Sequence, residues 1–348
     1  MTDDENVTND NPAISIFEAV KQGDFEVFQQ WYKIAPALIQ TQDEETEHLR
    51  FFHFVAKYCP NVEILKYLVN LGADANEKDG FDHEPLYEAV ASNPNIEIIK
   101  YLVSLGADVN ASDNYGATPS HSAAMDNPDV EVLKYLVSQG ADVNAKSYYG
   151  ATPLHDAAKG NSNVEILMYL VSQGADVNEK AVDNWTPLHS AAHGNSNVEI
   201  LKYLVNQGAD ANAIDDRYGM TLLHFAAWND DNPDVEFFEY LMSLGADINA
   251  KDEDGKTPLH FAAWKDSNGD ILKYLVSQGA KVNEKNKDGW TPLHFAAKGS
   301  SNVKILEYLV NQGADVNAKD KEDRTPLDVA ISEEIKAYLQ SFGGRSGR

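Results

Sequence analysis

Residues 152–178 read TPLHDAAKGNSNVEILMYLVSQGADVN, and much of this stretch returns at regular intervals along the chain. Thr-Pro-Leu-His begins again at Thr186, Thr257 and Thr291. The glycine of Gly-Ala-Asp, or once Gly-Ala-Lys, recurs at steps of 34 residues with a single step of 37, namely at Gly72, Gly106, Gly140, Gly174, Gly208, Gly245, Gly279 and Gly313. Self-similarity at such a period predicts an array of small, stacked structural units.

The sequence of each repeat predicts two helices followed by a polar, hairpin-like loop. Thr152 is a favourable N-cap, and Pro153 suits the first helical position, where its missing N–H costs nothing. A second helix is expected to begin near Ser162, whose spacing to Glu165 suits a capping box, and apolar residues then follow at helical spacing. Gly174 ends that helix, because a left-handed C-cap conformation favours glycine.

Thr-Pro-Leu-His together with Gly-Ala-Asp-Val-Asn strongly resembles the ankyrin repeat family, over residues 13–342. The resemblance implies an all-α ankyrin-repeat α-solenoid, in which helix-turn-helix units are joined by β-hairpin-like loops. The usual ankyrin period is 33 residues, and most repeats here carry one extra residue between the two helices. Thr325-Pro326-Leu327-Asp328 keeps the helix start, but no Gly-Ala-Asp follows it.

We therefore expect one ankyrin-repeat domain over residues 13–342. Its N-terminal residues look like a degenerate capping repeat and its C-terminal residues like a shortened one. The expected organisation is a disordered acidic N-terminus (1–12), an N-cap (13–42), eight repeats (43–317), a C-cap (318–342) and a flexible tail (343–348).

The composition excludes several classes of function. The 348 residues contain 28 Lys and Arg against 55 Asp and Glu, a formal charge of −27, which disfavours nucleic acids and anionic membranes as partners. Cys59 is the single cysteine, so a disulfide framework or a four-cysteine zinc site is excluded. No secretory signal is recognisable at the N-terminus, and no apolar run approaches the roughly 20 residues that span a bilayer. We expect a soluble, cytoplasmic protein.

The histidines are expected to be structural. Seven of the ten share one repeat position, and the resemblance implies that a histidine there hydrogen-bonds the backbone between repeats. His189 and His193 are spaced like a metal-binding pair on a helix, but His189 belongs to the structural column. No phosphate loop and no catalytic arrangement is visible, so we expect no catalytic residue, no cofactor and no metal. The seven histidines are His53, His121, His155, His189, His224, His260 and His294.

Binding residues are expected at the positions that vary between repeats, because only these respond to an irregular partner. The resemblance implies a concave binding face, formed by the hairpin loops and the first helices. Trp and Tyr are enriched in interface hot spots. Phe225, Phe261 and Phe295 are expected to pack beneath the hairpins as framework. The candidate partner-binding residues are Tyr115, Tyr149, Trp185, Tyr218, Trp228, Trp264 and Trp290, flanked by Asp215, Asp216, Asp252 and Asp254.

These features predict a non-enzymatic protein–protein interaction scaffold or adaptor. The partner would be a protein with a basic or mixed apolar and basic surface, and the chain itself is expected to be a monomer. The alternative is an inhibitor or effector that occludes the active site of a target enzyme. A passive spacer array is the further alternative if the variable positions are inert.

Overall fold

The computed structural model describes residues 12–34, 50–195, 197–229, 235–265, 269–299 and 302–347. Of residues 1–12, expected to be disordered, residues 1–11 lie outside this set and Pro12 begins the first helix. The chain divides into two compact parts. The N-terminal part comprises residues 1–157 and 165–175, and the C-terminal part comprises residues 158–164 and 176–348.

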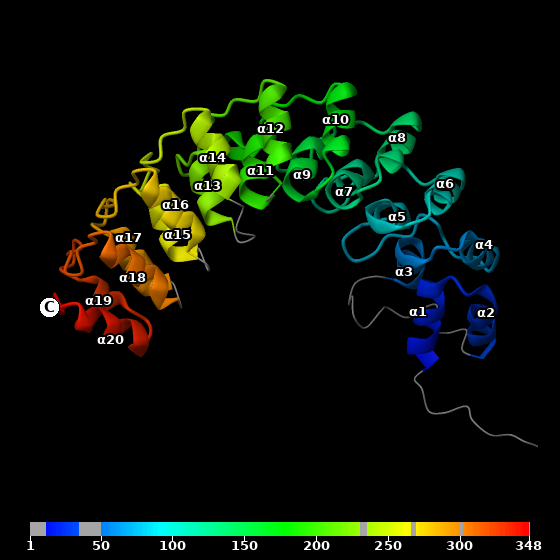
Figure 1. The fold of residues 1–348 in the computed structure, drawn as a ribbon. Helices are drawn as coiled ribbons and strands as arrows, with labels where there is room; N and C mark the ends of the chain where they lie inside the picture. Colours follow the sequence, from blue (N-terminus) through cyan, green and yellow to red (C-terminus); the bar gives the residue numbers. More distant parts are fainter. Residues whose placement is uncertain are drawn as a thin grey trace, which may run out of the picture. The chain divides into compact units, whose positions relative to one another are not determined.

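The N-terminal part begins with α1 (Pro12–Gln22) and α2 (Phe25–Ile34), which are followed by pairs of short helices (Figure 1). The first helices of these pairs are α3 (Phe51–Tyr58), α5 (Pro85–Ser92) and α7 (Pro119–Asp126), with α9 (Pro153–Gly160) next in the chain. The second helices are α4 (Val62–Asn70), α6 (Ile96–Ser104), α8 (Val130–Ser138) and α10 (Val164–Ser172).

The C-terminal part continues the same pattern, with a short 3-10 turn, η2 (Val182–Asn184), before its first pair. Its first helices are α11 (Pro187–Gly194), α13 (Leu222–Trp228), α15 (Pro258–Lys265), α17 (Pro292–Gly299) and α19 (Pro326–Val329). Its second helices are α12 (Val198–Asn206), α14 (Val235–Ser243), α16 (Asp270–Ser277), α18 (Val303–Asn311) and α20 (Glu333–Ser341). The described residues form helices without strands, so the predicted all-α repeat fold is confirmed.

The first helices begin where the sequence predicts, and a histidine completes their cap. Nδ1 of His189 accepts the backbone N–H of Thr186 at 3.1 Å, and Nδ1 of His260 accepts that of Thr257 at 2.9 Å. This is a capping box in which histidine takes the place of the usual glutamate. The cap fixes the tautomer, because a ring nitrogen that accepts at Nδ1 carries its hydrogen at Nε2.

The second helices are capped differently from the prediction. α10 begins at Val164, so the residue before it is Asn163 and not Ser162. In the repeats on either side of it in the sequence, Asp129 and Asn197 cap α8 and α12 by accepting the N–H two residues onward. The predicted box between Ser162 and Glu165 is therefore wrong by one residue. A short side chain directly before the helix reaches the free N–H groups of the first turn.

A second asparagine column, which the sequence analysis missed, joins several repeats to the one before each of them. Nδ2 of Asn195 donates to the carbonyl oxygens of Ala158 (3.1 Å) and Asn161 (2.9 Å), while its Oδ1 accepts the N–H of Asn197. In the N-terminal part Asn127 likewise donates to the carbonyl of Val90. These amides are buried. They donate to carbonyl groups at the end of a helix, which have no hydrogen-bond partner within that helix.

We expect Asn195→Ala to lower the free energy of unfolding by about 2–3 kcal/mol, because it removes three hydrogen bonds and leaves buried carbonyl groups without this donor. Urea unfolding followed by tryptophan fluorescence measures the change. Asn206→Ala, at an exposed position of α12, is the matched control and should change stability by less than about 0.5 kcal/mol. Equal effects of the two substitutions would contradict the assigned role.

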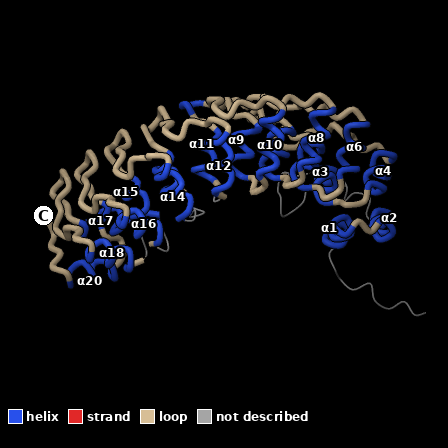
Figure 2. Tube along the Cα trace, turned by 45° about the horizontal axis from the view of Figure 1, so that its top comes forward, coloured by secondary structure: helices blue, strands red, loops and turns tan. Residues whose placement is uncertain are grey.

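Backbone hydrogen bonds connect the hairpin loops of successive repeats. In the C-terminal part the N–H of Asp216 donates to Asp183 (2.9 Å) and that of Glu253 to Tyr218 (2.7 Å), with equivalent bonds further along. Figure 2 shows the loops of this part, in tan, lying together on one side of the helices. The loops therefore form a connected edge next to the first helices, where the variable side chains lie.

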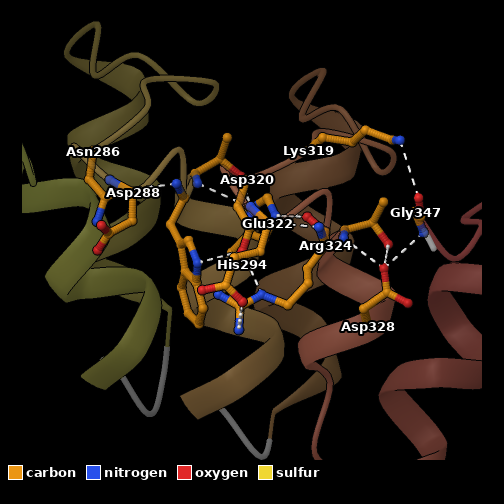
Figure 3. A network of polar contacts seen from close by, with 12 residues as sticks. Asn286, Asp288, His294, Lys319, Asp320, Glu322, Arg324, Asp328 and Gly347 are labelled. Atoms are coloured by element: carbon orange, nitrogen blue, oxygen red, sulfur yellow. Dashed lines mark hydrogen bonds and ion pairs between the residues drawn. The ribbon is translucent and has the colours of Figure 1, made fainter.

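The last residues of the chain complete the final repeat. Nδ2 of Asn317 donates to the carbonyl of Gly343 (3.1 Å), and its Oδ1 accepts the N–H of Arg345 (2.8 Å). In the preceding repeat Asn283 makes the same two bonds, to Gly313 and Asp315. Gly343-Gly344-Arg345 thus takes the place of the Gly-Ala-Asp that the C-cap was expected to lack. Within the segment expected as a flexible tail, Gly347 also donates its N–H to Oδ2 of Asp328 (2.9 Å), and its carbonyl oxygen accepts a hydrogen bond from Nζ of Lys319 (3.2 Å) (Figure 3).

Candidate functional site

The histidine column joins neighbouring repeats, as the resemblance implied. Nε2 of His224 lies 3.1 Å from the carbonyl oxygen of Lys256, and Nε2 of His260 lies 3.2 Å from that of Trp290. His53, His121 and His294 make the equivalent contact. Burial lowers the pKa of His224 and of His260 to about 4, so both imidazoles are neutral at pH 7. Both ring nitrogens are therefore occupied by the fold.

His189 and His193 belong to different environments. His189 caps α11 through Nδ1, whereas His193 is exposed, with its ring centroid 5.7 Å from that of Trp185. The two rings thus take part in a helix cap and in an aromatic contact, respectively.

The four candidate tryptophans lie in the C-terminal part and pack on buried phenylalanines. Trp185 meets Phe225 edge to face at 4.8 Å, and Trp228 stacks on Phe261 at 5.4 Å. Trp264 lies 5.9 Å and Trp290 lies 5.3 Å from Phe295. We call these seven side chains the aromatic row. The phenylalanines are at most 7% exposed, which confirms that they are framework.

The tryptophans of the aromatic row differ in how much surface they leave open. Trp264 is 43% exposed and lies against Gly299, where a Cβ atom would stand only 1.8 Å from its ring. Trp228 is half-buried. Trp290 is covered by two cations, Lys298 at 5.1 Å and Arg324 at 5.8 Å from its ring centre. Trp264 is therefore the most open ring of the row, whereas Trp185, Trp228 and Trp290 are half-buried.

The indole N–H groups of the other two tryptophans are bound within the protein. Nε1 of Trp185 donates to Oγ of Ser190 at 2.8 Å, and Nε1 of Trp290 donates to Oδ2 of Asp320 at 3.0 Å. A buried indole usually finds such a partner. These bonds fix the two outer rings of the row.

The candidate tyrosines lie at the hairpin loops and are open to solvent. Tyr218 is 43% exposed and has the guanidinium of Arg217 5.1 Å from its ring centre. Tyr115 and Tyr149 belong to the N-terminal part and are 53% and 63% exposed. Of the three candidate tyrosines, Tyr218 is therefore the one that lies in the C-terminal part, together with the aromatic row.

The four candidate aspartates divide into two kinds. Asp216 and Asp254 are exposed, and Asp254 pairs with Lys256 at 2.7 Å. Asp215 and Asp252 were expected on the rim of the binding face, but their residues are only 2% and 8% exposed. Asp215 accepts the N–H of Arg217, Tyr218 and Met220, and Asp252 accepts that of Lys256. Because these carboxylates hold the loops together, they do not form the rim.

The sequence analysis missed an ionic cluster in the N-terminal part, at the repeat positions that the aromatic row occupies in the C-terminal part. Nδ1 of His83 lies 3.1 Å from Glu88, and Glu88 pairs with Lys57 at 2.8 Å. Burial alone would lower the pKa of His83, but the carboxylates of Glu88, Asp79 and Asp113 raise it overall. Burial would also raise the pKa of Glu88, but its two cationic partners, His83 and Lys57, lower that pKa to about 2. The signal was the departure from the common residues, since these positions hold alanine, serine or aromatic residues in most repeats.

The described helices include none that is both long enough and apolar enough to cross a membrane. A search of curated protein sequences returned no match. Among solved structures, the crystal structure of the human ASB11 ankyrin repeat domain is similar, with 27% sequence identity and a TM-score of 0.56. The match covers 65% of this chain and 97% of that one.

Family models cover nearly the whole repeat array. The model described as "Ankyrin repeats (3 copies)" matches residues 16–113, 52–147, 105–181, 154–252 and 259–341. The model described as "Ankyrin repeats (many copies)" matches residues 232–276. With the capped helix pairs, the inter-repeat histidines and the connected loops, these matches establish that the chain belongs to the ankyrin repeat family.

Proposed function

We propose that this chain is a non-enzymatic interaction module that binds a partner protein on the face formed by the hairpin loops and first helices of its C-terminal part. Ankyrin repeats in general are protein–protein interaction modules. The observation that carries the proposal is the aromatic row. Its tryptophans stand at positions that vary between repeats, and the Trp264 ring is exposed although it is fixed against Gly299 and Phe295.

Rigid aromatic side chains suit this role because they offer a large contact area at a small cost in conformational entropy. Trp228 stacks on Phe261, so its ring is already ordered before a partner arrives. The exposed carboxylates of Asp216 and Asp254 border the same loops. We infer a partner that places apolar side chains on Trp228 and Trp264 and basic side chains next to the loops.

The overall charge of −27 supports a basic partner through long-range attraction. The cations over Trp290 and Tyr218 limit this argument locally, because they would repel basic groups from those two rings. The basic side chains of the partner are therefore expected near Asp216 and not over Trp290.

The double substitution Trp228→Ala and Trp264→Ala is expected to reduce partner capture at least tenfold, since it removes the exposed ring of Trp264 and the half-buried ring of Trp228. Affinity purification with mass spectrometry, comparing wild type and variant at low and high salt, measures this. Capture by the wild type should fall at high salt, because exposed charges are screened.

Met168→Ala is the matched control, because Met168 is a large exposed apolar residue on the second helix α10 and belongs to the N-terminal part. It should leave capture unchanged, and far-UV circular dichroism should show the same helix content in all variants. Undiminished capture by the tryptophan variant would overturn the proposal. Assaying the partner's own activity in the complex separates an adaptor from an inhibitor.

A further inference from the structure

The ionic cluster of the N-terminal part has the geometry of a metal site. We propose that Asp79, His83 and Glu88 bind one divalent transition-metal ion of the Zn²⁺ class. The proposal does not depend on the protein-binding function above. Each of these residues offers one ligand atom, a carboxylate oxygen or an imidazole nitrogen, and the three atoms all lie within 4.8 Å of one another.

The two distances at Nδ1 of His83 fit a tetrahedral ion. Nδ1 of His83 is 3.1 Å from Oε1 of Glu88 and 3.5 Å from Oδ2 of Asp79. Bonds of about 2.0–2.1 Å to Zn²⁺ place tetrahedral ligand atoms about 3.3–3.4 Å apart. The two separations at Nδ1 therefore need to change by only a few tenths of an ångström, and water would take the fourth position.

The backbone holds the carboxylate of Asp79 against the imidazole. Its Oδ1 accepts the backbone N–H of Phe81 (2.8 Å) and of His83 (2.9 Å). Its Oδ2 lies 3.5 Å from Nδ1 of His83, and the side chain is only 1% exposed. A buried carboxylate is costly unless it is paired, and a cation between Oδ2 and Nδ1 would pair with it.

The surrounding groups hold the ligands in place. Nε2 of His83 faces Oδ2 of Asp113 at 3.4 Å, an arrangement in which a carboxylate orients a metal-binding imidazole. Lys57 holds the other oxygen of Glu88 at 2.8 Å, and Tyr87 stacks on the imidazole with ring centres 4.1 Å apart. The histidine side chain is 16% exposed, which leaves an approach for the ion.

The charges also favour a divalent cation. Asp79, Glu88 and Asp113 carry three negative charges around the imidazole, and Lys57 supplies one positive charge. With a neutral imidazole the net charge of these groups is −2, and a divalent cation would neutralise it. The mixed nitrogen and oxygen ligands favour Zn²⁺ over Mg²⁺ or Ca²⁺, which prefer oxygen ligands alone.

Isothermal titration of the full-length chain with ZnCl₂ tests the proposal. The expected result is one Zn²⁺ per chain, bound with the same affinity in excess Mg²⁺. His83→Ala should abolish binding, and Asp113→Asn should weaken it by about 10- to 100-fold, because Asp113 positions the ligand. Glu88→Gln should weaken it at least tenfold and serves as the second ligand variant if His83→Ala does not fold.

Substitution with Co²⁺ gives a further readout, because a tetrahedral Co²⁺ site absorbs visible light, and the spectrum should vanish in His83→Ala and change in Glu88→Gln. His193→Ala, which removes an exposed histidine outside the cluster, should keep full affinity. Absence of stoichiometric binding would overturn the proposal and leave His83 as an ion-pair centre only. Equal affinity of the wild type, His83→Ala and Glu88→Gln would do the same.

Discussion

Lowering the pH from 7 to 4.5 is expected to reduce the free energy of unfolding of the C-terminal part by about 5 kcal/mol through His224 and His260 alone. Burial lowers the pKa of each to about 4 in the folded chain, against 6.5 for an ordinary histidine. Between these values the unfolded chain binds protons that the folded chain does not, so stability falls as the pH falls from about 6.5 towards 4. Each histidine contributes about 2.5 kcal/mol of this change at pH 4.5.

Urea unfolding at pH 7 and pH 4.5, followed by tryptophan fluorescence, measures the difference. The double substitution His224→Gln and His260→Gln is the decisive comparison, because glutamine suits the same capping position but carries no charge. This variant should be less stable than wild type at pH 7, but its stability should fall by about 5 kcal/mol less on acidification. His193→Gln, at an exposed position, should follow the wild type. Identical pH dependence in all three proteins would refute the assignment.

Asp320→Ala is expected to lower the free energy of unfolding of the C-terminal part by about 3–5 kcal/mol, because one buried carboxylate accepts four hydrogen bonds. Oδ1 accepts the backbone N–H of Glu322 and of Arg324, both at 2.8 Å. Oδ2 accepts Nε of Arg324 (2.8 Å) and Nε1 of Trp290 (3.0 Å). Figure 3 shows Asp320 at the centre of these contacts.

The chain itself supplies the control for this prediction. In the preceding repeat Asn286 holds the equivalent position and accepts the backbone N–H of Asp288 and of Trp290 through Oδ1. Asp320→Asn should therefore keep the two backbone bonds and lose the two side-chain bonds, at a cost of about 1–2 kcal/mol. Urea unfolding of both variants distinguishes the contributions. Equal losses for alanine and asparagine would show that the backbone bonds contribute little.

The helix pairs and the histidine column could be predicted from the sequence, because their determinants are local. Thr186 and Pro187 begin α11 by capping and by a preset backbone angle, and the histidine three residues after the threonine completes the same turn. The buried asparagines were equally visible as a column. They were assigned to the turn between helices because their role depends on carbonyl groups of the preceding repeat, which lie at least 34 residues away.

The candidate site was harder to predict, since neighbouring residues of a loop point in different directions. Asp215 and Asp216 are adjacent, yet the first is buried in its loop and the second is exposed. The repeat position of Asp215 did indicate its role, because a residue that recurs at one position is typical of the framework. Asp79, Asp113, Asp252 and Asp320 share that position. The cluster at His83 could not be found in this way, because His83 and Glu88 stand in columns that mostly hold other residues, and Lys57 and Asp113 reach them from the neighbouring repeats.

The contacts of residues 343–347 continue the repeat pattern past α20. Asn317 uses the same donor and acceptor that Asn249 and Asn283 use towards the repeat that follows each of them. A substitution or deletion that displaces Gly343 and Arg345 would therefore leave the side-chain amide of Asn317 to water, as would removing the following repeat from any other asparagine of this column.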